Sequence, residues 1–378
     1  MVSPGLSTLP SPRRPAADAR VRRRQHVCVV GEDLSGPPDE GLKKFVYQLT
    51  RALRREHDLS VVSLSRQSSW PGAERVPPSR TFVSAALRRV LARRDPDIVV
   101  YAARSSSTFM AFVRGRMLRR YCPRARMVML GLQPRRHSRL QRGLIPYLAP
   151  DLVCVQTRSS ATYLRRLGCS TLVLPSGVDL DTFRPATPAR RRALRARHGL
   201  SADQPVVLHV GHLQPGRNLG VLADLAARAN CQVVLVTSSS LEQAPGLAAP
   251  LRRAGVRVIT DYQPCIEQLY QLADVYLFPV LSSDNAIEVP LSVLEAFACD
   301  LPVATTRFGG LPRLFESHGC TGLRFVDSPR ELVSAAEQLC HSTPSGTRAL
   351  AAPFSWERVA STLLERASAD EHDRLSSR

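Results

Sequence analysis

The sequence predicts an α/β protein made of two doubly wound, Rossmann-like domains that face a central cleft. Three observations support this fold class. Short β-branched runs alternate with helical patterns, which is typical of a parallel sheet covered by helices on both faces. The alternation stops near residue 175 and begins again near residue 205. The chain has 378 residues and is 44% apolar, which favours two domains that each have a core.

The first alternating run begins with HVCVVG, residues 26–31, a β-branched strand that ends in glycine. A helix is expected next, because apolar residues between Leu42 and Leu53 recur at helical spacing. The other strands of this run are expected at 59–64, 97–101, 127–130, 152–155 and 171–174, and its other helices at 106–120 and 159–167.

The second run follows a proline-punctuated break and a basic helix expected at 189–197. In helix 290–298, Pro290 suits the first helical position, where its missing N–H costs nothing. The remaining strands are expected at 205–210, 233–237, 256–259, 275–279 and 301–305, and the remaining helices at 219–229, 266–272 and 329–340. Because ligands bind beyond the carboxyl ends of such strands, the loops there should line the cleft.

The bulk composition limits the possible partners. The formal net charge is +20, and residues 101–150 hold eleven arginines and no Asp or Glu. This stretch is either a solvated surface or a contact for anionic lipid, an anionic membrane surface or nucleic acid. Nucleic acid is the least favoured, because aromatic residues are sparse there and no nucleic-acid motif is present.

Targeting and redox features are few. No apolar run approaches the roughly 18 residues that a membrane span needs. The Pro- and Arg-rich residues 1–25 lack the apolar core of a secretory signal and are expected to be disordered. The nine scattered cysteines form no CxxC pair, which argues against zinc and against a complete disulfide framework. A reducing cytoplasm is the simplest location.

The loop after the first strand, GEDLSGPPDEGLKKF, places Gly41 at a helix entrance. There the backbone of Gly41 can approach a substrate closely, although an ordinary flexible loop explains the pattern equally well. The loop is not a GxGxxG fingerprint, so the sequence disfavours nicotinamide or flavin binding.

The corresponding loop of the second domain is GHLQPGRNL. Gly211 ends a strand, and His212 and Arg217 flank a Pro-Gly turn. Two side chains that can be cationic near a helix N-terminus are a plausible clamp for a diphosphate. Asn218 can cap the helix that follows. The alternative is an exposed turn with no ligand.

A third candidate region runs from Ala286 to Leu311. Glu295 has apolar neighbours on several sides of its helix, so it should be partly buried, where an unpaired carboxylate is costly. Gly309 and Gly310 let the backbone approach a ligand. A helical carboxylate beside a glycine-rich turn suits a ribose hydroxyl pair next to a phosphate. Glu288, in the preceding loop, is a further candidate, and Asp284 is a weaker one.

These segments together resemble the retaining glycosyltransferases of group 1, also called family 4, which have the GT-B fold. The resemblance covers residues 26–368 and depends on five segments. They are PSGVDLDTFRP, VGHLQPGRNL, ADVYLFPV, PLSVLEAFACDLPVATTRFGGLP and FSWERVASTLL. The last of them is similar to the family's terminal helix, which crosses back onto the first domain.

The resemblance implies a hexosyltransferase-type enzyme that retains anomeric configuration and needs no metal or cofactor. Glu295 would bind the donor ribose, and Arg217 with His212 would neutralise the diphosphate leaving group. The Gly309-Gly310 loop would offer backbone donors, Gly211 would lie beside the donor, and Gly41 would lie by the reacting centre. Glu288 is predicted to take part in catalysis.

The resemblance also implies a division of the chain. We expect a basic tail at 1–25, an N-terminal acceptor domain at 26–185 and a linker at 186–204. A nucleotide-sugar domain at 205–353 and a crossing helix at 354–370 would follow. The partners would be a nucleotide-sugar donor and a glycan, lipid-linked or small-molecule acceptor. The location would be cytoplasmic, with possible peripheral contact to the inner face of the membrane.

The sequence departs from the family pattern at two catalytic positions. Ile287 stands where the family has its first glutamate, one residue before Glu288. The family's first-domain histidine is missing from its usual place, and His137 follows several residues later. A nucleotide-sugar-binding protein with weak or no activity is therefore an alternative, and a nucleotide-sugar epimerase is a less favoured one.

Overall fold

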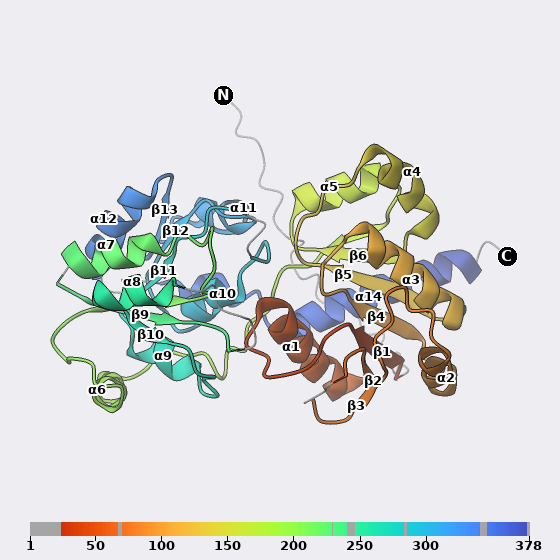
Figure 1. Cartoon of the computed structure of the whole chain (residues 1–378), viewed down its shortest axis with the longest axis horizontal. Coiled ribbons are helices and arrows are strands. Elements are labelled where there is room, and N and C mark those ends of the chain that lie inside the picture. The colour runs from red at the N-terminus through yellow and green to blue at the C-terminus, as the bar shows by residue number, and fades with distance from the viewer. Residues whose placement is uncertain are drawn as a thin grey trace, which may run out of the picture.

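The structure, a computed structural model, describes residues 24–66, 70–228, 230–239, 246–282, 286–340 and 346–375. Two all-parallel sheets lie side by side with helices around each of them (Figure 1). The first sheet has the strand order β3-β2-β1-β4-β5-β6-β7, and the second has the order β10-β9-β8-β11-β12-β13. In both sheets the order reverses beside the first strand of the run, so the predicted doubly wound fold class is confirmed.

The N-terminal sheet and its helices follow one another from residue 26 to residue 173. The elements are β1 (His26–Gly31), α1 (Gly41–Glu56), β2 (Asp58–Ser63), β3 (Ala73–Arg75), α2 (Ala85–Arg94), β4 (Ile98–Ala102), α3 (Phe109–Tyr121), β5 (Arg126–Gly131), α4 (Arg139–Leu148), β6 (Leu152–Val155), α5 (Arg158–Arg166) and β7 (Thr171–Val173).

The C-terminal part of the chain begins with a basic helix and ends with a long one. The elements are α6 (Pro188–Arg197), β8 (Val206–Val210), α7 (Gly220–Arg228), β9 (Gln232–Val236), α8 (Ala248–Arg253), β10 (Arg257–Ile259), α9 (Glu267–Leu272), β11 (Val275–Phe278), α10 (Leu291–Ala298), β12 (Val303–Thr306), α11 (Leu311–Phe315), the 3-10 helix η2 (Glu316–His318), β13 (Leu323–Val326), α12 (Pro329–Cys340), α13 (Arg348–Ala351) and α14 (Trp356–Leu375).

The structure corrects several local predictions. The sequence patterns missed the short edge strands β3 and β13 and the helices α2, α4, α8, α11 and α13. Helix α3 begins at Phe109 instead of at 106, because Ser106 has a left-handed φ of 59° in a turn. Pro290 is the N-cap of α10 and not its first helical residue, since its ψ of 128° is extended.

Each sheet is buried between two apolar layers. Helix α14 belongs to a layer of the N-terminal sheet, where the ring of Trp356 packs edge-on against Phe45 at 5.1 Å. The chain enters this helix beside Val178, whose N–H donates to the carbonyl of Phe354 at 2.7 Å. A Cβ at Gly177 would lie 2.7 Å from the Trp356 ring, so only glycine fits there.

Four further features for which the sequence makes a prediction are the cysteines, the basic tail, the domain boundaries and membrane-spanning helices. All nine cysteines are free. Of the predicted basic tail, residues 1–23 lie outside the described residues. The predicted domain boundaries at 185, 204, 353 and 370 stay predictions. In the described part of the chain, no helix combines the length and apolar character required to cross a membrane.

Candidate functional site

A cavity of about 760 Å³ lies between the two sheets and is lined by both halves of the chain. The N-terminal half contributes the loop before α1 and the first turns of that helix, including Gly41 and Lys44. The C-terminal half contributes the loop after β8, with Gly211, His212 and Arg217, together with Glu295 of α10. The cavity therefore joins the carboxyl ends of β1 and β8, where doubly wound sheets bind ligands.

Arg217 is the most unusual side chain of the cavity. It is only 5% exposed, and its buried Nε has no hydrogen-bond partner within the described ranges. Among the described residues, no acidic side chain forms an ion pair with it. Burial lowers the pKa of Arg217 to about 10, so the guanidinium is still charged at neutral pH. A buried, unpaired cation that lines a cavity is a strong indication of an anionic ligand.

His212 lies beside Arg217 in the same loop, and no described residue forms a hydrogen bond with its buried Nδ1. Burial, and then the charge of Arg217, lowers the pKa of His212 to about 4. His212 is therefore neutral at pH 7. Of the two side chains that the sequence suggests can be cationic, only Arg217 carries a charge at this pH. In this state, the ring can donate one hydrogen bond to an anion while Arg217 supplies the charge.

The position of Gly211 admits only glycine, because a neighbouring side chain of the same domain leaves no room for a Cβ. A Cβ at this position would lie 2.7 Å from Nε2 of His209, a fully buried ring on β8. The Nδ1 of His209 contacts the carbonyl of Leu277 at 2.8 Å, which fixes the ring. The sequence suggests Asn218 as a cap for the following helix. In the structure its side-chain amide donates to the carbonyl of Pro279 at 3.3 Å.

Glu295 is 3% exposed, so it is more deeply buried than the predicted partial burial. Both of its carboxylate oxygens have partners. Nζ of Lys44 lies 2.5 Å from Oε1, and the hydroxyl of Tyr270 donates to Oε2 at 2.9 Å. Lys44 lies on α1 of the N-terminal half, so this ion pair crosses the cavity between the domains. A ribose diol that binds Glu295 would have to share the carboxylate with Lys44 or displace Lys44 from it.

Gly41 lines the cavity at the start of α1, the helix entrance where the sequence places it. A Cβ at Gly41 would make only ordinary contact with Ile287, at 3.7 Å. The protein itself therefore leaves room for a side chain here, and the space is part of the cavity. Ile287 also lines the cavity, so the position that resembles the family's first glutamate presents an apolar side chain to it.

The side chain of Glu288 points away from the cavity, towards the start of α5. Its carboxylate accepts hydrogen bonds from Thr157 Oγ1 at 2.8 Å and Ser160 Oγ at 2.7 Å, both at the start of α5. Burial raises the pKa of Glu288. Among the described residues that line the cavity, Ile287 is present and Glu288 is not. The geometry thus gives Glu288 an interdomain contact in place of the predicted position beside the reacting atoms.

The two glycines after β12 also differ from their prediction. Gly309 has a φ of 53°, and a Cβ there would lie 2.3 Å from the carbonyl oxygen of Glu288. The N–H of Gly310 donates to the same carbonyl at 2.8 Å. Neither glycine is among the described residues that line the cavity. Their close approach is therefore to the Glu288 backbone, which leaves no free amide at Gly310 for a ligand.

Sequence patterns missed other residues of the cavity. Lys44 lies on the α1 face that carries Gly41 one turn earlier, so helical spacing could have found it. Glu40 also lines the cavity, and burial raises the pKa of its carboxylate. Asp39 accepts from the Ser238 hydroxyl at 2.9 Å and from the Ser239 N–H at 2.7 Å, a contact between the domains that only the structure shows.

The remaining candidates lie outside this group. His137 is buried, and its ring nitrogens contact Ser107 O at 2.9 Å and Tyr163 Oη at 3.0 Å. Asp284 lies outside the described residues. Within the described ranges, no three His, Cys, Asp or Glu side chains are grouped as a metal site requires. The prediction that the reaction needs no metal or cofactor stays a prediction.

One protein family matches part of the C-terminal half of the chain. Residues 204–342 match the family described as glycosyl transferases group 1. This segment contains β8, the loop after it that carries Arg217, and α10, which carries Glu295.

Curated relatives match a similar length of chain. The D-inositol 3-phosphate glycosyltransferase of Mycobacterium avium is 30% identical over 209 residues, which cover 51% of this chain and 47% of that protein. The protein of the same name from Xylanimonas cellulosilytica is 31% identical over 248 residues, which cover 57% of this chain and 56% of that protein. The chain thus spans about half the length of the curated relatives it matches.

Solved structures match nearly the whole chain. HepE of Anabaena in complex with UDP superposes with a TM-score of 0.70 at 17% identity, covering 91% of this chain and all of that one. Sucrose-phosphate synthase of Thermosynechococcus elongatus also has a TM-score of 0.70, at 16% identity, covering 94% and 100%. At this identity the likeness concerns the fold alone, and it confirms the predicted GT-B arrangement of two facing sheets.

Proposed function

We propose that this chain transfers a sugar from a nucleoside diphosphate sugar to an acceptor hydroxyl, with retention of anomeric configuration. The observation that carries the proposal is Arg217, a buried guanidinium with no acidic partner among the described residues, in a cavity between two doubly wound domains. A diphosphate leaving group is an anion that such a cation can neutralise.

The similar proteins support the same substrate class. Residues 204–342 match a glycosyltransferase family, and these residues contain most of the proposed donor site. HepE of Anabaena, which shares the fold, was solved with UDP and also with UDP-glucose. Arg217 and Glu295 line one cavity here, so a diphosphate at the first and a ribose at the second can belong to a single ligand.

The chemistry would depend on charge and position. The bond between the sugar's anomeric carbon and the diphosphate oxygen breaks, and the acceptor oxygen bonds to the same carbon. Arg217 stabilises the charge that develops on the leaving group, and neutral His212 adds a hydrogen bond. The acceptor proton would pass to the departing phosphate. Removing one such stabilising group from an enzyme typically slows turnover by roughly 10²–10³-fold.

The acceptor would enter from the N-terminal half, past Gly41 and Ile287. A glycan, a lipid-linked sugar or a small molecule all fit this proposal, and the arginine-rich residues 101–150 suit an anionic acceptor. We retain cytoplasmic location and metal independence as predictions. Unchanged transfer in the presence of a chelator would support the second of these.

The proposal is tested by binding and then by transfer. Wild type and Arg217→Met are screened against nucleoside diphosphate sugars by thermal stabilisation. A donor at 100 times its dissociation constant should stabilise wild type by about 2.7 kcal/mol. The stereochemistry of the product, read by NMR from a donor of known anomer, then tests retention. Stabilisation of wild type by none of the common nucleotide sugars would contradict the proposal.

A second candidate function is a nucleotide-sugar-binding protein without transfer activity. Ile287 in the cavity and the turning of Glu288 towards α5 favour it, because they leave the sugar end of the site without that carboxylate. This function predicts donor binding by calorimetry with no turnover. Transfer of radiolabelled sugar to any component of a cell extract would reject it.

A further inference from the structure

Helix α4 exposes more apolar surface than a helix on a soluble domain usually does. Leu140 is 76% exposed, Leu144 42% and Tyr147 78%, and only Ile145 of this helix is buried. Among the described residues, six large hydrophobic side chains are exposed, and α4 carries three of them. Isolated exposed apolar residues need no explanation, but three on one helix of ten residues form a patch.

The three side chains lie on one face. Their spacing of four and then three residues places Leu140, Leu144 and Tyr147 within about 60° of one another around the helix axis. Ile145 lies on the opposite side and anchors α4 in the N-terminal core. The patch is therefore an outward stripe roughly 10 Å long, the rise of seven residues.

The surroundings of the stripe are basic. Arg136 and Arg139, before and at the start of α4, are exposed and have no acidic partner among the described residues. The neighbouring helix α5 adds exposed arginines at 165 and 166, and the loop after it packs on α4. A Cβ at Gly168 in that loop would lie 3.3 Å from Pro146. Figure 1 shows α4 and α5 together at the outer edge of the N-terminal half.

The stripe is also close to the cavity. Gln133 lines the cavity, and α4 begins only six residues later, at Arg139. Six residues span at most about 20 Å even when fully extended. Whatever binds the stripe is therefore held near the entrance that an acceptor would use.

We propose that the exposed face of α4 docks on an anionic lipid bilayer. Leu140, Leu144 and Tyr147 would enter the headgroup region, and Arg136 and Arg139 would contact anionic headgroups. An apolar stripe with arginines beside it is the pattern of helices that lie in a membrane interface, and tyrosine is favoured at that depth. Nucleic acid would use the arginines but gives no partner to aliphatic side chains.

The test is flotation of the whole chain with two kinds of vesicle, one of phosphatidylcholine and one of an equimolar mixture of phosphatidylcholine and phosphatidylglycerol. We expect binding to the mixed vesicles, weakened by salt, and little binding to phosphatidylcholine alone. Combined Leu140→Ser, Leu144→Ser and Tyr147→Ser should lower the partition coefficient about tenfold or more. Arg136→Gln with Arg139→Gln should lower it less and remove part of the salt dependence.

Val83→Ser is the matched control, because Val83 is 66% exposed but lies away from α4. It should bind like wild type, and equal melting curves for all variants would show that each is folded. Three results would overturn the proposal: wild type that does not bind mixed vesicles, a triple variant that binds as wild type does, or equal wild-type binding to both vesicles. A dimer in lipid-free buffer that the triple variant abolishes would instead assign the stripe to contact between copies. Vesicle binding needs no nucleotide, so it is independent of the proposed transfer.

Discussion

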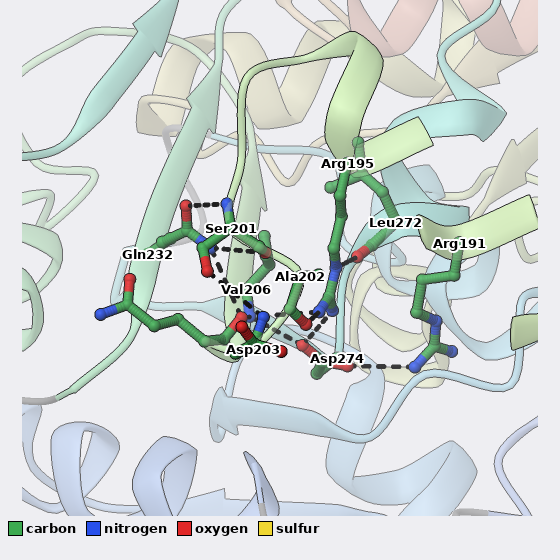
Figure 2. Close-up of polar contacts among 10 residues, drawn as sticks. Arg191, Arg195, Ser201, Ala202, Asp203, Val206, Gln232, Leu272 and Asp274 are labelled. Carbon is green, nitrogen blue, oxygen red and sulfur yellow. Dashed lines mark hydrogen bonds and ion pairs between the residues drawn. The ribbon is translucent and has the colours of Figure 1, made fainter. Parts of the chain in front are cut away.

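Two buried arginines lie at opposite ends of β8, and their surroundings differ completely. Arg195, on α6, is packed at the amino end of β8, where it donates to the carbonyls of Leu272 at 2.9 Å and Ala202 at 3.0 Å and forms an ion pair with Asp274 (Figure 2). Arg217 follows the carboxyl end of β8 and has no such partners in the part of the chain that the structure describes. The same side chain therefore supports the fold at one end of the strand and lines the candidate site at the other.

This contrast shows how a fold can keep an uncompensated charge. The network around Arg195 satisfies its donors, and Asp274 also accepts from the Val206 N–H at 2.7 Å, at the start of β8 (Figure 2). The strand is thus fixed from the amino end. Its carboxyl end can then carry a cation that has no acidic partner among the described residues, at a cost in stability that the rest of the domain offsets.

The largest effect is expected for Arg195→Met. The substitution leaves the Asp274 carboxylate without its buried partner, which typically destabilises a protein by about 3–5 kcal/mol. Urea denaturation measures this loss. Arg191→Met is the control, because Arg191 contacts the same carboxylate at 3.0 Å from a more exposed position and should cost about 1 kcal/mol or less. Equal losses for the two variants would contradict the structural role given to Arg195.

Arg217→Met should give the opposite pattern. Donor consumption should slow by about 10²–10³-fold, or about 2.7–4 kcal/mol, because the charge facing the leaving group is lost. Stability without ligand should stay the same or rise, since an unpaired buried charge is removed. Steady-state kinetics and urea denaturation on the same preparation check both parts. A variant that unfolds as readily as Arg195→Met would show that Arg217 also serves the fold.

His209 tests the carboxyl end of β8 by pH. Burial lowers its pKa to about 4 from an ordinary value of 6.5, and among the described residues no group accepts a hydrogen bond from its Nε2. The unfolded chain therefore binds more protons between these values, so stability is full above pH 6.5 and falls as the pH drops towards 4. At pH 5 the loss should be about 2 kcal/mol.

The measurement compares denaturation at pH 7.5 and pH 5 for wild type and His209→Gln. The variant cannot titrate at this position, so its stability should change less between the two pH values. The pH difference is the readout, because the substitution itself alters packing. If both proteins lose the same amount, the histidine does not titrate as its burial indicates.

Glu295→Gln separates the two ends of the proposed donor. Nucleoside diphosphate affinity should fall about tenfold, because a charged acceptor for the ribose hydroxyls becomes neutral. Affinity for inorganic pyrophosphate, which lacks the ribose, should not fall. Calorimetry with both ligands tests this pair of outcomes. An equal fall for both would place Glu295 on the phosphates, or show that breaking its contact with Lys44 disturbs the whole cavity.

The fold could be predicted well from the sequence, because this fold depends on repeated local patterns. Buried strands and amphipathic helices are visible as short apolar runs and helical spacings. Arg217 is found in the loop after such a strand, and Glu295 within such a helix. Short edge strands such as β3 and a mostly exposed helix such as α4 give weak patterns, so they were missed. Contacts between the domains, such as that of Lys44 with Glu295, depend on tertiary docking and leave no local pattern.

The loop at Ile287 and Glu288 shows the same limit at the scale of one residue. Adjacent side chains in an extended loop point in different directions, and the sequence does not tell which one faces the cavity. The backbone contact of Glu288 with Gly310, at 2.8 Å, settles the direction in the structure. Ile287 faces the cavity as a result, and Glu288 faces α5.

The smallest effect is therefore expected for Glu288→Gln. Glutamine can accept from one of Thr157 and Ser160 and donate to the other, so both contacts at about 2.8 Å can persist. We expect a change in kcat/KM and in stability worth about 1 kcal/mol or less. Ile287→Glu is the matched variant, because it returns a carboxylate to the cavity and should change donor turnover more than Glu288→Gln does. A loss of turnover in Glu288→Gln as large as that of Arg217→Met would contradict this. It would show that Glu288 acts at the reacting centre and that the loop of Ile287 and Glu288 changes conformation when a donor binds.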